Sequence, residues 1–148
     1  MKRFYKKLLE DSEKRLGELL KHALLHLGLI FTGFFVFIAT TKFPFQNVAN
    51  IQHIIATSAA IFLGVVTTAV FHEWFHLFGA QLGRSAYSIP RKFGVFIFEW
   101  DFAENGVQKF YIMSIAGSIG GLLAILILSK ALPEIDLRYN NMVLASAF

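Results

Sequence analysis

The apolar positions of this chain fall into three long runs that are separated by more polar connections. These runs cover roughly residues 23–40, 51–78 and 110–132, and they hold few charged side chains. Each has about the length that an α-helix needs to cross the hydrocarbon core of a bilayer, which is roughly 20 residues. The pattern predicts an α-helical integral membrane protein with three transmembrane helices.

Residues 1–22 show a different pattern, in which Tyr5 and five leucines recur at three- and four-residue spacing, with charged residues on the other side. This is typical of an amphipathic helix, which we expect to be cytoplasmic or to lie in the membrane interface. A solvated helix that docks on a partner is the alternative. The final residues, 140–148, resemble the start of a fourth span, which predicts that a further transmembrane helix follows.

Residues 79–109 form a more polar loop between the second and third spans, interrupted by glycines and a proline. Within this loop, residues 93–102 are rich in aromatic and β-branched side chains, which predicts one or two short strands. We therefore expect an N-terminal helix over 1–22 and one membrane domain over 23–148, which carries a small cytoplasmic β element.

Composition supports lipid as the solvent of most of this chain. Of its 148 residues, 55% are hydrophobic and 16% are charged, whereas soluble domains carry about a quarter of charged residues. Cysteine is absent, which excludes a disulfide framework and a thiolate metal site. Any metal must therefore be bound by nitrogen and oxygen ligands.

The positive charges are distributed unevenly between the two predicted sides of the membrane. The N-terminal segment and the loop 79–109 together hold eleven Lys and Arg residues, whereas the connection 41–50, the last turn of the third span and the tail after it hold three. The positive-inside rule then places the N-terminus and the loop in the cytoplasm. The basic segment also carries acidic residues and leads directly into a span, so nucleic acid is not expected as a partner.

The sequence His72-Glu73-Trp74-Phe75-His76 is an H-E-x-x-H motif near the end of the second span. On a helix, residues four apart share one face, so both imidazoles can reach a single Zn²⁺. Ionisable residues inside an apolar span are costly, which makes such a cluster a candidate functional site. The alternative is a core helix that buries two histidines and a glutamate without using them.

Three other histidines are present in the apolar regions. His22 and His26 are also four apart, and we expect them to be interfacial residues with their polar tips in water. His53 precedes His72 by 19 residues, or about 28 Å along a helix, so it cannot share the site.

With this motif and its surroundings, the chain resembles the site-2-protease family of intramembrane zinc metalloproteases. The resemblance rests on His72 to His76 in the second span, on the β-rich segment 91–101, and on the sequence Ile115-Ala-Gly-Ser-Ile-Gly-Gly at the start of the next span. It covers roughly residues 51–130. Gly117 and Gly121 form a small-xxx-small pair suited to close helix packing.

The resemblance implies that His72 and His76 are zinc ligands and that Glu73 is the general base, which accepts a proton from a zinc-polarised water. The loop strand, at Val95 and Ile97, would bind substrate in extended form by adding it to a sheet edge. The third metal ligand is not identified, because the Asp-Gly dipeptide that supplies it in the family does not occur in this sequence. Individually weak candidates from the connecting segments are Glu99, Asp101, Glu104 and Asp136.

The resulting hypothesis is a membrane-embedded zinc metalloprotease that hydrolyses peptide bonds in or near transmembrane segments of protein substrates. The alternative is a non-catalytic, protease-like accessory subunit that packs in a larger membrane complex. The missing Asp-Gly and the phenylalanine-rich apolar surface favour this second reading.

Overall fold

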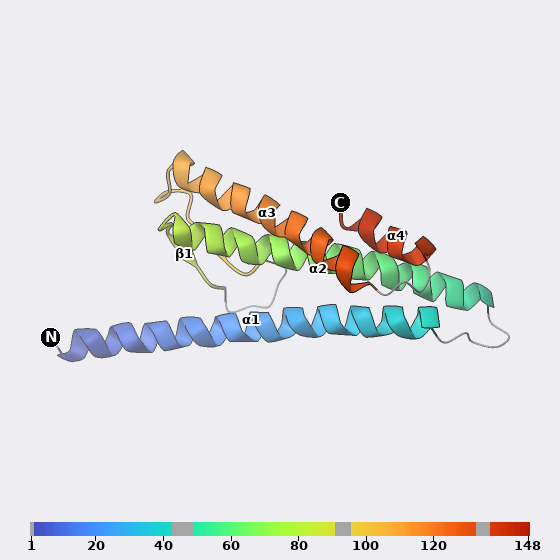
Figure 1. Cartoon of the computed structure of the whole chain (residues 1–148). Coiled ribbons are helices and arrows are strands. Elements are labelled where there is room, and N and C mark those ends of the chain that lie inside the picture. The colour runs from blue at the N-terminus through green and yellow to red at the C-terminus, as the bar shows by residue number, and fades with distance from the viewer. Residues whose placement is uncertain (1, 43–48, 91–95, 133–136) are drawn as a thin grey trace.

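The computed structural model describes residues 2–42, 49–90, 96–132 and 137–148, and helices dominate these segments (Figure 1). In the described part of the chain, the helices are α1 (Lys2–Lys42), α2 (Ala49–Leu82), α3 (Val107–Ala131) and α4 (Leu137–Ser146). Between α2 and α3, the short strands β1 (Tyr87–Ser88) and β2 (Glu99–Trp100) pair antiparallel, with Tyr87 opposite Trp100. The fold is therefore a helical bundle with a two-stranded sheet at one end.

Three of these helices contain segments that are long and apolar enough to cross a membrane. The segments are Glu13–Lys42, Ile51–Leu82 and Val107–Ala131, and they include nearly all of the three predicted spans. The prediction of three apolar helices of spanning length is confirmed. The end of the chain also forms a helix, α4, although its ten residues are too few to span a bilayer.

The N-terminal amphipathic segment and the first apolar run are parts of one helix. α1 continues without a break through the predicted boundary at residues 22 and 23. No proline interrupts this stretch, and it is rich in leucine, lysine and glutamate, which favour the helix. The boundary therefore marks a change of polarity along α1 and not a change of backbone structure.

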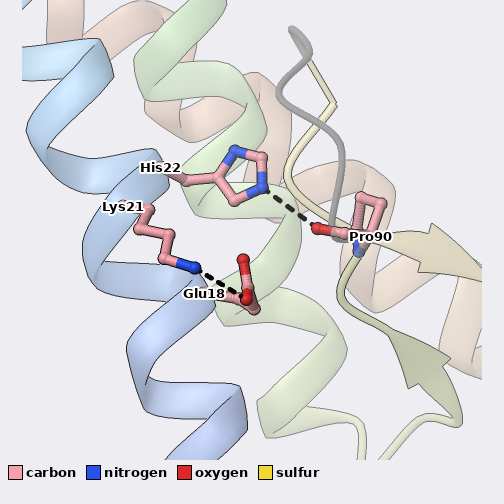
Figure 2. A network of polar contacts seen from close by, with 4 residues as sticks. All are labelled: Glu18, Lys21, His22 and Pro90. Carbon is pink, nitrogen blue, oxygen red and sulfur yellow. Dashed lines mark hydrogen bonds and ion pairs between the residues drawn. The ribbon is translucent and has the colours of Figure 1, made fainter.

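The N-terminal half of α1 docks on the segment that contains β1. The Arg15 guanidinium lies 5.3 Å from the centre of the Tyr87 ring and donates a hydrogen bond of 3.2 Å to the Tyr87 carbonyl. Immediately before the apolar run, His22 Nε2 lies 3.4 Å from the Pro90 carbonyl oxygen, beside the ion pair between Lys21 and Glu18 (Figure 2). The amphipathic half of α1 thus binds the protein's own loop.

The prediction that β strands occur in residues 93–102 is met by β2, which lies in that range. Its partner β1 lies upstream of the predicted range. The two strands are linked by Asn105, whose side chain accepts a hydrogen bond from Ala86 N at 2.8 Å and donates to the carbonyls of Ala86 and Asp101 at 2.6 and 2.7 Å. The sheet is too short to form many hydrogen bonds between its own strands, and the Asn105 amide adds further ones.

Two hydrophobic clusters hold the bundle together. One joins all four helices and includes Phe37, Leu63, Leu128 and Val143. The other joins α2, the loop and α3, and its buried members are Leu77, Ala80, Ile97, Phe98 and Met113. The second cluster surrounds the last turns of α2, where the H-E-x-x-H motif lies.

A first prediction concerns topology. The N-terminal end of α1 and the paired strands β1 and β2 lie at the same end of the bundle (Figure 1), so cysteines introduced at Lys14 and Glu104 should react with an impermeant reagent from the same side of the membrane. The positive-inside rule makes this the cytoplasmic side. A cysteine at Asn141 in α4 should react only from the opposite side, and the cysteine-free parent protein supplies the background. Labelling of Lys14→Cys and Glu104→Cys from opposite sides would contradict this arrangement.

Candidate metal centre

The last turns of α2 bring the three predicted residues of the motif together. His72 and His76 lie one helical turn apart, and their Nε2 atoms are 2.8 Å from each other. A carboxylate oxygen of Glu73 joins them, so that one candidate ligand atom from each residue lies within 4.8 Å of the others. Within the described residues, these three side chains form the one group of histidine and acidic residues that is compact enough to hold a metal ion.

This cluster lies inside an apolar helix. Glu73 is only 9% exposed, and both histidines are partly buried. A carboxylate and two imidazoles at this depth lose hydration that only a specific partner can replace. A bound cation would offset this cost, because it would neutralise Glu73 and satisfy the two facing nitrogen atoms.

A hydrogen bond to α3 fixes the orientation of the His76 ring. His76 Nδ1 lies 2.9 Å from the backbone carbonyl oxygen of Met113. A carbonyl can only accept, so Nδ1 carries the hydrogen and Nε2 of the neutral ring presents its lone pair toward His72. Metal-binding histidines commonly make such a contact with their second nitrogen, because it fixes both the tautomer and the ring orientation.

The separation of the two histidines is close to what zinc requires. Two nitrogens on a tetrahedral Zn²⁺, each about 2.0–2.1 Å from the ion, are about 3.3 Å apart. The Nε2 atoms here are 2.8 Å apart, so a shift of each nitrogen atom by a few tenths of an ångström would bring them to the distance that the ion needs. In the present arrangement His72 Nε2 donates a hydrogen to His76, and this hydrogen must leave Nε2 before both atoms can bind metal.

The close approach of α3 to the motif depends on Gly117. A Cβ atom at this position would lie 2.5 Å from both ring nitrogens of His76. A Cβ at Gly121 would instead meet Thr68 Cγ2 at 3.7 Å and His72 Nδ1 at 3.8 Å, which are ordinary van der Waals distances. Of the two glycines that the sequence singled out, only Gly117 is required for the position of a predicted ligand.

No third ligand separate from Glu73 is found in the described segments. Of the four predicted carboxylates, Glu99, Asp101 and Glu104 do not belong to the cluster, and Asp136 lies outside the described residues. Asp101 instead accepts hydrogen bonds from the backbone amides of Ala103 and Glu104, which stabilise the turn after β2. The histidine and carboxylate ligands that the described segments bring together are therefore His72, His76 and Glu73.

No family model, curated protein or solved structure matches this chain. The resemblance to the site-2-protease family therefore remains a prediction, and the chemistry of the site has to be argued from its residues.

The predicted substrate-binding positions have different outcomes. Val95 lies outside the described residues. Ile97 is fully buried beside Leu77 and Met113, so its side chain offers no exposed surface to a substrate. Because Met113 provides the carbonyl that orients His76, packing of Ile97 supports the metal centre from the loop side.

The histidines of α1 differ from the prediction. His22 and His26 are buried, with exposed fractions of 1% and 3%, instead of carrying their tips into water. His26 Nδ1 accepts a hydrogen bond of 3.1 Å from the indole of Trp74, which lies inside the motif. His53 lies near the other end of α2 and contacts the Tyr139 hydroxyl at 2.8 Å, which agrees with its predicted separation from the site.

Sequence reasoning missed two contacts that position the motif. The Met113 carbonyl carries no signal in the sequence, because any residue has one. The pairing of Trp74 with His26 joins residues 48 positions apart. One signal could have suggested this pairing. His26 is a polar residue in the first apolar run, and Trp74 in the second run carries an indole N–H that needs a hydrogen-bond acceptor when buried.

Proposed function

We propose that this protein is a membrane-embedded zinc metalloprotease that hydrolyses peptide bonds in or near transmembrane segments. The observation that carries the proposal is the convergence of His72, Glu73 and His76 within an apolar helix of spanning length. The Met113 contact adds support, since it leaves the His76 lone pair directed at the position that a shared ion would take.

Each residue of the cluster has a distinct role in this chemistry. His72 and His76 would hold the metal through their Nε2 atoms. Zn²⁺ bound there would supply Lewis acidity toward a water molecule and toward the scissile carbonyl. Glu73 would accept the proton of the attacking water and later deliver it to the leaving amine, so that the proton balance closes as the C–N bond breaks.

The β1–β2 element is the proposed substrate-docking part of the protein. The Arg15 hydrogen bond to the Tyr87 carbonyl occupies part of the outer edge of β1, so an extended peptide would add to the outer edge of β2 through backbone hydrogen bonds. The second hydrophobic cluster joins this sheet to the last turns of α2, which places the edge near the metal centre. In the proposed orientation both face the cytoplasm.

A non-catalytic accessory subunit is the second candidate function. It is favoured by the ligand set, since the described residues offer only Glu73 beside the two histidines. If Glu73 is a ligand, it cannot also act as the general base. The protein would then bind metal for stability and contribute its helices to a larger membrane complex.

The metal itself provides a second prediction. Protein purified without chelators should contain close to one zinc per chain, and His76→Ala should lose most of it, because the two remaining groups bind weakly. Zinc is measured by elemental analysis. Chelation should also stop cleavage of a transmembrane substrate in proteoliposomes, and added zinc should restore it.

His53→Ala is the matched control, because His53 lies in the same helix but pairs with Tyr139 away from the site. This variant should retain its zinc. Wild-type protein that lacks zinc and other transition metals would refute the proposed metal centre. A zinc-loaded protein without any cleavage activity would instead support the accessory subunit.

A further inference from the structure

The turn between β2 and α3, together with the first turn of α3, exposes large apolar side chains that no part of the described chain covers. Phe102 is 79% exposed, Val107 is 68% exposed and Tyr111 is 60% exposed. With Trp100 and Phe110 they form what we call the aromatic patch. Two of its rings contact each other: the centroids of Trp100 and Phe110 are 6.4 Å apart in an edge-to-face arrangement.

The aromatic patch belongs to a hydrogen-bonded part of the structure. Trp100 is paired with Tyr87 in the sheet, and the turn after it is fixed by hydrogen bonds of Asn105 and Asp101. A hollow of about 340 Å³ lies between Trp100, Phe102, Val107 and Phe110. The exposure of these side chains is therefore built into the fold and does not arise from a loose loop.

An exposed apolar stripe runs from the aromatic patch along α3. Its members recur at four- and three-residue spacing and are all more than half exposed: Val107, Tyr111, Ile115, Ile119, Leu122 and Leu126. Because α3 is long and apolar enough to span a bilayer, this stripe is the face that lipid chains would cover. The aromatic patch then lies where the span leaves the hydrocarbon.

We propose that the aromatic patch inserts into the headgroup–hydrocarbon boundary of the bilayer and holds the β1–β2 element against the membrane surface. Aromatic side chains favour this boundary because their rings are apolar and their N–H or O–H groups remain hydrated. The exposed acidic neighbours Glu99, Asp101 and Glu104 outnumber the lysine of the first turn of α3, Lys109, so attraction to anionic headgroups does not drive the contact. The aromatic patch therefore binds the lipid boundary itself. This binding does not depend on the charge of the lipids or on the proposed protease activity.

The chain contains two tryptophans, which allows a direct test. In Trp74→Phe protein, Trp100 is the only tryptophan, and its fluorescence reports on the aromatic patch. In phosphatidylcholine vesicles, we expect a blue-shifted emission, loss of most intensity with lipids brominated near the headgroup, and weaker quenching by lipids brominated near the chain end. Anionic lipid should not change this pattern.

Phe102→Ser in the same background should shift the emission to longer wavelength and reduce quenching by the shallow bromines. Leu126→Ser replaces an exposed apolar side chain of the α3 stripe, far from Trp100, and should leave the signal unchanged. Emission typical of water, with full quenching by acrylamide and none by brominated lipid, would overturn the proposal. Protection from both quenchers would also overturn it, because a protein surface would then cover the aromatic patch.

Discussion

Replacing Glu73 with glutamine is expected to slow proteolysis by orders of magnitude while leaving zinc in place. Glutamine has nearly the same shape as glutamate, but it cannot accept the proton of the attacking water. General acid–base catalysis contributes roughly 10²–10⁴-fold, and cleavage of a membrane substrate in proteoliposomes should slow by about this factor. Zinc content and helicity should match the wild-type protein.

The metal content of Glu73→Gln also separates the two candidate functions. Loss of zinc together with activity would identify Glu73 as the third ligand, in agreement with its place in the compact cluster, and would contradict its role as the base. Glu104→Gln is the matched control, because Glu104 is exposed in the turn after β2 and does not belong to the cluster. This control should cleave normally, and a Glu73→Gln protein that cleaves as fast as the wild type would refute the role of Glu73 as the general base.

Gly117→Ala is expected to weaken zinc binding through the His76 ring. The added methyl group would lie 2.5 Å from both ring nitrogens, so either the ring must rotate or α3 must move away. Rotation breaks the contact with the Met113 carbonyl, and loss of such a supporting contact typically costs 10–100-fold in metal affinity. Movement of α3 is a case of overpacking, which costs about 1–3 kcal/mol of stability.

The measurements are zinc affinity by competition with a chelating dye and thermal unfolding in detergent. Gly121→Ala adds the same methyl group to the same face of α3, but its nearest neighbours are 3.7 and 3.8 Å away. It should keep zinc affinity and stability close to wild type. Equal effects of the two substitutions would show that general helix packing, and not the His76 ring, limits metal binding.

The sequence by itself determined the helical part of this architecture. Three long apolar runs specify three helices of spanning length, because backbone groups in an apolar medium must be satisfied within the segment. The spacing of His72 and His76 likewise fixes their common face, since the periodicity of a helix is local. The continuity of the first apolar run with the amphipathic segment 1–22 could also be predicted locally, because no proline separates them.

Only the tertiary structure decided how this cluster is supported. The hydrogen bond from His76 to Met113, the room that Gly117 leaves for the ring, and the pairing of Trp74 with His26 all depend on the packing of α1 and α3 against α2. A sequence pattern shows which residues are apolar or small, but it does not show which backbone carbonyl or ring lies opposite them.

The loop shows the same limit. Apolar residues of the segment 93–102 suggested a substrate-binding strand, yet Ile97 is buried against α2 and α3, while Phe102 is exposed. Both are apolar residues of one short segment, so composition alone cannot separate them. Burial is a property of the neighbours that the fold brings together, and for this reason the core of the loop and its exposed aromatic patch were assigned only by the tertiary structure.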